Sequence, residues 1–461
     1  MAETKGKGTK TDTGANVTRL TVEEGNLKNV TISANGGGNS VNIAHLIDKF
    51  KYSESILDPT IRVQLRYVDT GSALEGKGII PGLPLVGTEE VRVIMEDANQ
   101  EKIDVELFVD DINQLGDDQQ NSVVDLALVS EEFIQNEDGK KRVNIRFNGK
   151  ISDHVNKVLT DQRFLNTQKK CSIEPTANVY NCIGVNRKPL AFNLWLQKKG
   201  VTTKADNSAG FFLWETSEGY QFKSVDGLFA QESSKKYIWN NIPDESGKNI
   251  PKGYDGQILE LTSDSNINAK SKLQIGSYTT RIVLFDPFNC HYEIIKPTVK
   301  PPAPGSTKGK DSKMEPKLAA EELPVKVFNK KFDMDFTRTT YMLWDTGGLP
   351  EGKADKQIEK SQEHNLEPEK LVNQASMRYN QMFTLKRSIT IAGDFTLHAG
   401  DAISIDIPQL QADKMNDDPE GDTLVSGLYI IVDLSHIITA NPPTCYTRMN
   451  LVRDSLTLPT D

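Results

Sequence analysis

Residues 61–67 read IRVQLRY, a stretch in which an apolar side chain alternates with a polar or charged one. A period of two is typical of a β-strand that buries one face and exposes the other, as strands of antiparallel sheets do. The alternation recurs along the chain, over the segments 91–95, 103–109, 143–147, 403–407 and 428–434. We therefore predict a mainly β fold.

The strand-rich segments fall into two groups that are separated by a stretch of mixed character. The first group, over 28–150, is predicted to be a closed or nearly closed β-barrel or a sandwich. The second group, over 384–461, is predicted to be a β unit of similar style, where no charge is expected to be buried. Between them we predict an α+β insert domain over 151–296, of which part of 209–240 can join the second barrel. The remaining predicted segments are a flexible polar tail over 1–27, a Pro/Lys-rich linker or loop over 297–324, and a continuation of the insert over 325–383 that includes a helix over 368–383.

Two helices are predicted near the start of the insert. Ser152 is a candidate N-cap for the first, because a serine hydroxyl can accept a hydrogen bond from the first turn. Pro189 fits the first position of the second helix, where its missing N–H costs nothing, and Gly200 is the candidate C-cap.

The composition narrows the class of protein. The chain of 461 residues is long enough for two to four domains, and its net charge is −10, with 54 Lys and Arg against 64 Asp and Glu. This balance argues against a protein whose main task is to grip DNA or an anionic membrane. No apolar run approaches a membrane span, and the first fifteen residues lack the apolar stretch of a secretion signal, so no membrane insertion is expected. Four cysteines are too few for a disulfide scaffold and fit synthesis in a reducing compartment.

The histidines and cysteines form no recognisable metal or catalytic motif. Cys171 and Cys182 are too far apart for a CxxC site. Cys290–His291 is interpreted as ordinary packing at a strand end. The histidines lie at positions 45, 154, 291, 364, 398 and 436, without HxH or HxxxH spacing.

The remaining polar motifs also favour structural roles. NGGG at 35–38 lacks the Lys-Ser/Thr of a phosphate loop and is interpreted as a flexible turn. The acidic pairs 110–111, 117–118 and 417–418 are interpreted as solvated turns, and no GxSxG elbow occurs. We therefore predict that the protein is not an enzyme and has no catalytic, cofactor-binding or metal-binding residues.

One cluster of large aromatic residues allows two interpretations. As an exposed platform it could stack on sugars, but the alternating and helical-face spacings favour a core that joins a helix to strands. The cluster comprises Trp195, Phe211, Phe212, Trp214, Tyr220, Phe222, Phe229 and Trp239.

Several strings, taken in order, resemble the baseplate hub proteins of contractile-tailed phages. This family includes the T4-type hub, late control protein D and the hub half of type VI secretion spikes. The resemblance covers about 40–456, and the order of the blocks is more specific than any one of them. The blocks are YSESILDP (52–59), PLVGTEEVRVIM (84–95), AGFFLWETSEGYQFKSVDGL (209–228), SITIAGDFTLHAGDAISIDIP (388–408), SGLYIIVDLSHII (426–438) and TRMNLVRDSL (447–456).

The resemblance implies an assembly role. The two β groups would each be a tube-like antiparallel β-barrel domain. Three copies would form a homotrimeric ring whose six barrels adapt a sixfold tail tube to a threefold central spike. Tape measure and baseplate wedge proteins are further candidate partners. DNA would pass through the lumen without specific binding, and the excess acids are expected to line that lumen. The expected location is the virion tail baseplate, assembled in the host bacterial cytoplasm.

Three alternatives stay open at this point. The first is the hub of a phage-derived contractile injection system rather than of a phage. The second is a tail-associated cell-wall hydrolase, which would need convergent carboxylates in a cleft. The third is a glycan-binding module that uses the aromatic cluster.

Overall fold

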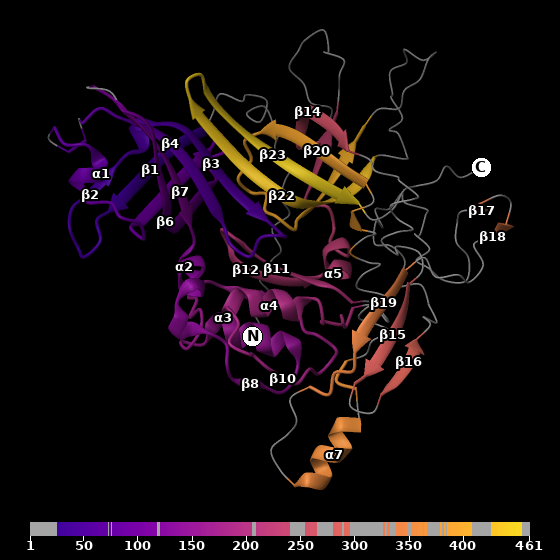
Figure 1. Ribbon diagram of the computed structural model, residues 1–461. Coiled ribbons are helices and arrows are strands. Elements are labelled where there is room, and N and C mark those ends of the chain that lie inside the picture. The colour runs from indigo at the N-terminus through magenta and orange to yellow at the C-terminus, as the bar shows by residue number, and fades with distance from the viewer. Residues whose placement is uncertain are drawn as a thin grey trace, which may run out of the picture.

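The computed structural model is mainly β, with an α+β part (Figure 1). One sheet of thirteen strands runs through two of its three parts, which we call the first unit and the second barrel. The insert packs below them in the view of Figure 1. The structure describes residues 25–71, 73–74, 76–117, 120–204, 209–239, 254–264, 280–287, 290–295, 326–327, 330–331, 338–347, 353–362, 364–366, 379, 382–383, 385–407 and 426–453.

The first unit is a curled sheet in the order β2-β1-β5-β6-β7-β4-β3. The alternation predicted from the sequence is confirmed, since Ile61, Val63, Leu65 and Tyr67 are all buried. The inward residues of its long strands share one core. Its strands are β1 (Gly25–Ser33), β2 (Ser40–Asn42), β3 (Ile47–Ser55), β4 (Arg62–Asp69), β5 (Glu90–Asp97), β6 (Lys102–Asp117) and β7 (Ser122–Val129), with the short helices η2 (Ala44–Leu46) and α1 (Ile79–Gly82).

The second barrel is closed by six strands, in the order β22-β21-β13-β14-β20-β23 and back to β22. It is not wholly antiparallel, because β13 runs parallel to both of its neighbours. Two of its strands, β13 and β14, lie well before residue 384, where the predicted second barrel begins. Its strands are β13 (Lys235–Ile238), β14 (Gly256–Asp264), β20 (Leu385–Ala392), β21 (Ala402–Asp406), β22 (Gly427–Ala440) and β23 (Pro443–Arg453).

The insert is a small α+β domain with its own core. Figure 1 shows β11, β12 and α5 between the second barrel and the helices α3 and α4. Its elements are α2 (Glu131–Glu137), η3 (Gly139–Lys141), β8 (Arg146–Phe147), α3 (Ile151–Thr160), β9 (Cys171–Ile173), β10 (Cys182–Ile183), α4 (Pro189–Gln197), β11 (Phe211–Thr216), β12 (Gly219–Ser224) and α5 (Val225–Phe229).

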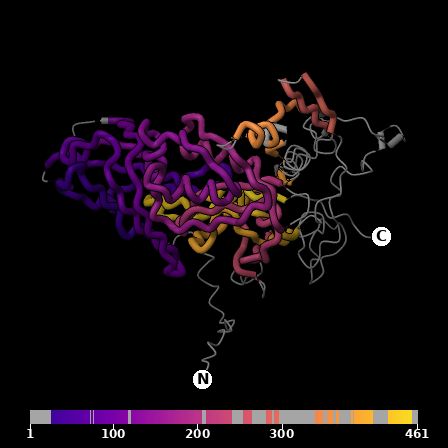
Figure 2. The backbone as a smooth tube through the Cα atoms, turned by 90° about the horizontal axis from the view of Figure 1, so that it is seen from below, coloured from indigo at the N-terminus to yellow at the C-terminus, as the bar shows by residue number. Residues whose placement is uncertain are grey.

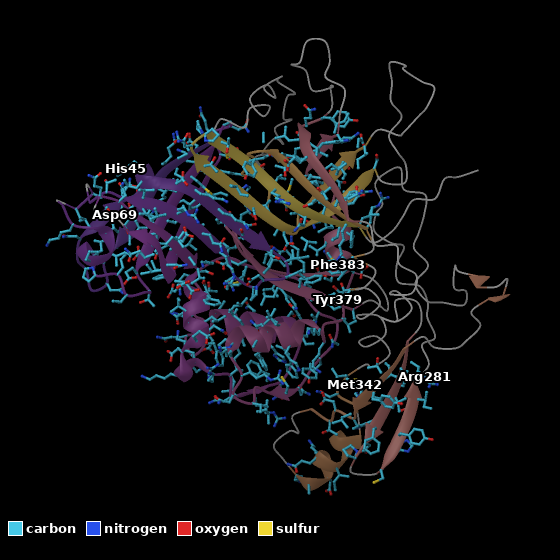
Figure 3. All side chains as sticks on the ribbon, turned by 45° about the horizontal axis from the view of Figure 1, so that its top comes forward. His45, Asp69, Arg281, Met342, Tyr379 and Phe383 are labelled. Atoms are coloured by element: carbon cyan, nitrogen blue, oxygen red, sulfur yellow. The ribbon has the colours of Figure 1, made fainter. Side chains whose placement is uncertain are left out.

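A three-stranded sheet set apart from the barrels continues the insert (Figure 3). Met342 packs against both this sheet's core and the core of the insert. The remaining described elements are β15 (Thr280–Asp286), β16 (His291–Ile295) and β19 (Arg338–Leu343) in that sheet, the pair β17 (Lys326–Val327) and β18 (Lys330–Lys331), and α7 (Ala354–Gln362). Among the described residues no helix is both long and apolar enough to cross a membrane.

Several local predictions need correction. The segment 143–147, expected in the first barrel, belongs to the insert, because β8 pairs with β10 and Val143 and Phe147 join the insert core. Ser152 lies inside α3, whose N-cap is Lys150, and the C-cap of α4 is Lys198 rather than Gly200. Pro189 does begin α4.

Other predicted segments lie outside the described residues. These are the tail 1–27, of which only the last three residues are described, the linker 297–324, and the acidic pair 417–418. Most of the helix predicted over 368–383 does as well. Of its residues, Tyr379 is described, and its hydroxyl bonds to the backbone N–H and C=O of Phe211 in β11 at 2.9 and 2.6 Å. Figure 3 shows Tyr379 and Phe383 near the boundary of insert and second barrel.

The first unit is not closed by its own strands. No pairing joins β1 to β3 among the described residues, and residues of the second barrel fill the seam. Phe395, Ile438 and Cys445 are part of the first unit's core. A Cβ on Gly25 of β1 would lie 2.2 Å from the Cβ of Cys445, so only glycine permits this approach. Figure 2 shows the first unit at one end of the body, with the C-terminal strands beside it in the middle of the body.

Candidate functional site: the duplicated sheet

The histidines and cysteines of the described residues do not gather into a metal site. The described residues hold no group of three or more His, Cys, Asp or Glu side chains placed to bind a metal ion. Cys290 and His291 lie at the start of β16, a strand end as predicted, and both side chains are exposed. Burial raises the pKa of the Cys182 and Cys445 thiols to about 12, which keeps both protonated at neutral pH.

One buried ion pair is a contact between domains, which we call the Glu54 clasp. The Glu54 carboxylate of β3 has no exposed surface and accepts hydrogen bonds from the Tyr52 hydroxyl at 2.7 Å, the Ser217 N–H at 3.0 Å and the Ala399 N–H at 3.0 Å. His398 Nδ1 lies 3.2 Å away. Burial disfavours the imidazolium, but the hydrogen bond and charge of Glu54 raise the pKa of His398 to about 9. First unit, insert and second barrel therefore meet on one carboxylate.

A second buried ion cluster joins the insert to the first unit. Lys169 Nζ lies 2.6 Å from Glu132 and 2.7 Å from Glu215. Glu215 also accepts from the Ser130 hydroxyl at 2.6 Å and the Ile61 N–H at 3.0 Å. These carboxylates are buried and already accept hydrogen bonds from donors of the protein itself. We therefore interpret the cluster as structural.

The aromatic cluster is largely core, as the spacings predicted. Phe211, Phe212, Trp214, Tyr220, Phe222 and Phe229 are buried, and Trp195 and Trp239 are half-buried. Trp214 Nε1 donates a hydrogen bond to the Ala399 carbonyl at 2.9 Å, which ties the insert to the second barrel. The buried rings cannot serve as an exposed sugar platform.

The first unit and the second barrel share one strand order. If six strands of each are ranked along the chain, with the short β2 left out, both sheets contain the order second–third–sixth–fifth–fourth–first. The ranked strands are β1, β3, β4, β5, β6 and β7 in the first unit, and β13, β14, β20, β21, β22 and β23 in the second barrel. Two differences stand out: the first and second strands pair only in the second barrel, and β13 runs opposite to β1 relative to its sheet. The chain thus contains the same sheet twice.

The register of the two sheets matches as well. A bulge follows Ile47 of β3 in the first unit, and its counterpart follows Ile258 of β14 in the second barrel. A second bulge follows Val109 of β6, and its counterpart follows Ile431 of β22. Val109 bonds through its backbone to residues 88 and 89, just as Ile431 bonds to residues 400 and 401. Bulges pin register, because one extra residue shifts every later side chain. The two sheets therefore correspond residue by residue around these four positions.

A strand-to-strand junction joins the two sheets. β22 pairs with β21 up to Ile430 and then continues past its barrel to pair with β3, from Asp433 opposite Ser55 to Thr439 opposite Lys49. The hydroxyls of Ser435 and Ser53 lie 3.1 Å apart across this junction. The junction makes one continuous sheet of the first unit and the second barrel.

The solvent-facing side of the first unit is hollowed. The hollow, of about 410 Å³, lies over the second, third, sixth and fifth strands of the unit. Its charges are mixed, and Arg66 pairs with Asp125 at 2.7 Å. It is lined by Lys49, Lys51, Gln64, Leu65, Arg66, Asp111, Asn113, Asp125, Leu126 and Ala127.

Comparisons with known proteins place the chain beside tail and spike components. No protein-family model and no curated protein matches the sequence. Among solved structures, a tail protein from Neisseria meningitidis is 7% identical, with 93% of this chain and 97% of that chain covered and a TM-score of 0.49. A 43 kDa tail protein of prophage MuSo2 from Shewanella oneidensis is 8% identical, over 94% and 100% of the two chains, with a TM-score of 0.49.

A component of the Escherichia coli type VI secretion system is also similar. It is 9% identical, over 92% of this chain and 77% of that one, with a TM-score of 0.43. The structural neighbours are thus phage tail, baseplate and type VI spike proteins. At TM-scores below 0.5, the function has to be argued from the geometry of this chain.

Sequence reasoning missed the buried polar groups of the second barrel. That barrel was expected to bury no charge, yet Arg387, Asp394 and Arg453 are buried, as is His436. The acidic pair 110–111, expected in a turn, lies within β6. From the sequence alone, a charged residue within a strand pattern is expected to be exposed. No local signal distinguishes the charged residues that another part of the fold covers.

Proposed function

We propose that this protein is the structural hub of a contractile phage tail baseplate. Three copies would form a ring of six equivalent sheets that adapts the sixfold tail tube to the threefold central spike. The observation that carries the proposal is the duplication. A chain with two sheets of one strand order and register, joined edge to edge, allows three copies to present six similar walls.

The sequence resemblance supplies the identity of the partners. Its blocks include parts of both sheets, such as 52–55 in β3 and 447–453 in β23. The proposed partners are a second and third copy, the central spike and the tail tube, with tape measure and wedge proteins as further candidates. The same role would suit the hub of a phage-derived contractile injection system. The proposed location is the virion tail, assembled in the host cytoplasm, and the proposed role needs no catalysis.

The hollow face is the proposed wall of the channel. It faces away from the core and spans four strands that recur in the second barrel. An acidic lining was expected from the net charge, but Lys49, Lys51 and Arg66 stand beside Asp111 and Asp125 on this face. We therefore propose a channel wall of mixed charge, in which acids interleaved with the cations weaken their hold on the phosphates of passing DNA.

The proposal is tested by mass and shape. Light scattering on the purified chain, alone and with a candidate spike protein, should give about 154 kDa for the trimer, three times the 51.3 kDa of one chain. Averaged electron micrographs of this species should show six lobes around a channel. A monomer that ignores both spike and tube proteins would overturn the hub role. Clearing of a peptidoglycan suspension by the chain would instead favour the hydrolase alternative.

A further inference from the structure

Two strand edges stay open within the part of the chain that the structure describes. β6 pairs with β5 up to Phe108, and Val109 bonds to residues 88 and 89, but on that side residues 110–117 have no partner strand. The described pairing of β14 with β13 covers residues 256–257, and among the described residues no strand lies beside 258–264 on that side. An open edge presents a row of N–H and C=O groups that another strand can pair with.

The duplication shows what such edges bind. β22 is the counterpart of β6, and past Ile431 its corresponding edge is filled by β3. β3 is in turn the counterpart of β14. Within one chain, the fifth strand of the second sheet therefore pairs with the second strand of the first sheet. The converse pair, the fifth strand of the first sheet and the second strand of the second sheet, is the pair whose edges are open.

We propose that β14 of one copy pairs antiparallel with residues 110–117 of β6 in the next copy, in the register of the β22–β3 junction. Counting from the bulges, Ser435 corresponds to Asn113 and Ser53 to Asp264. Asn113 then lies opposite Asp264 of the next copy. This inference rests on the proposed ring, for which it supplies the contact between subunits. Repeating one junction alternately within and between chains is how a head-to-tail ring closes.

The side chains suit this pairing. Asn113, Gln114, Thr262 and Ser263 are exposed and polar, like the serine pair at the existing junction. In this register Gln114 falls opposite Ser263 and Leu115 opposite Thr262, so uncharged side chains meet at its centre, whereas Asp117 and Glu260 meet at its end. Residues directly opposite each other in antiparallel strands have Cβ atoms about 4.5–5.5 Å apart, which is near the reach of a disulfide.

Paired cysteines test the register. On a Cys290→Ser background, which removes the exposed native thiol, Asn113→Cys and Asp264→Cys are introduced into one chain. Mild oxidation is expected to give disulfide-linked dimers and trimers on a non-reducing gel. The matched positive control is Ser53→Cys with Ser435→Cys, the same register within one chain, which should close without any gain in mass. The negative control, Asn113→Cys with Ser263→Cys, is offset by one residue, so its thiols point to opposite faces.

The outcomes separate this interface from the ring itself. Linked trimers from the 113/264 pair, and none from the offset pair, support the interface. A trimer by light scattering that the 113/264 pair fails to link, or that the offset pair links equally well, overturns the interface but leaves the hub role standing. A chain that stays monomeric with spike and tube proteins present overturns both.

Discussion

Replacing Glu54 by glutamine is expected to remove a pH dependence of stability that the Glu54 clasp creates. His398 has an ordinary pKa of 6.5, which the clasp raises to about 9 in the folded chain. At about 1.36 kcal/mol per pH unit, this gap corresponds to about 3 kcal/mol of stability. Because folding raises this pKa, the contribution is fully present below pH 6.5 and is lost as the pH rises through 9. At pH 7 about 2.5 kcal/mol of it should still be present.

The measurement is urea denaturation, followed by tryptophan fluorescence, at pH 6 and at pH 9.5. The wild-type chain should lose about 3 kcal/mol between these values, and Glu54→Gln should lose much less because the amide cannot stabilise the imidazolium. Glu359→Gln, at an exposed position on α7, is the matched control and should follow the wild type. Equal losses in wild type and Glu54→Gln would refute the reasoning, as would a wild-type stability that does not change over this range.

Three further perturbations test the packing between domains. Lys169→Met should destabilise the chain by about 3–5 kcal/mol because it leaves two buried carboxylates unpaired, and glutamine at both carboxylate positions should restore much of the loss in urea denaturation. Gly400→Ala should lower the urea midpoint far more than Gly37→Ala. Both glycines have a positive φ, which costs an alanine about 1 kcal/mol or more. At Gly400 the new Cβ would also lie 2.4 Å from the Trp214 ring, whereas at Gly37 it would meet no atom within 4 Å. A similar midpoint for both would contradict the described packing. Titration of the native chain with a thiol reagent should label Cys290 first, since it is exposed, while Cys171 is half-buried, Cys182 and Cys445 are buried, and burial raises the pKa of all three; early labelling after Cys290→Ser would speak against this.

The prediction of strands succeeded where one-dimensional periodicity is sufficient. In 61–67 the apolar positions are those that the structure buries, because a half-buried strand must alternate whatever its partner is. The aromatic cluster was likewise placed in a core by its spacing alone. The same reasoning assigned 143–147 to the wrong domain, since a short alternating run does not specify which strand it pairs with.

The Glu54 clasp and the duplicated sheet could not be found in this way. Glu54 lies two positions after Tyr52, on the same buried side of β3. Its partners His398 and Ser217 are far away along the chain. In the second barrel, β13 and β14 are separated from β20 along the chain by the three-stranded sheet of β15, β16 and β19, so the strands of the barrel are not consecutive. The correspondence of Ile47 with Ile258 rests on pairing and bulges, which leave no repeated string of residues.

The amino-acid order by itself determined the strands, the faces that they bury and the mixed character of the insert, because these depend on neighbours a few positions away. Only the tertiary structure decided which strands pair, that one sheet occurs twice, and which charges are buried. The physical reason is that hydrogen bonds between strands and the desolvation of charges depend on residues brought together from distant parts of the chain.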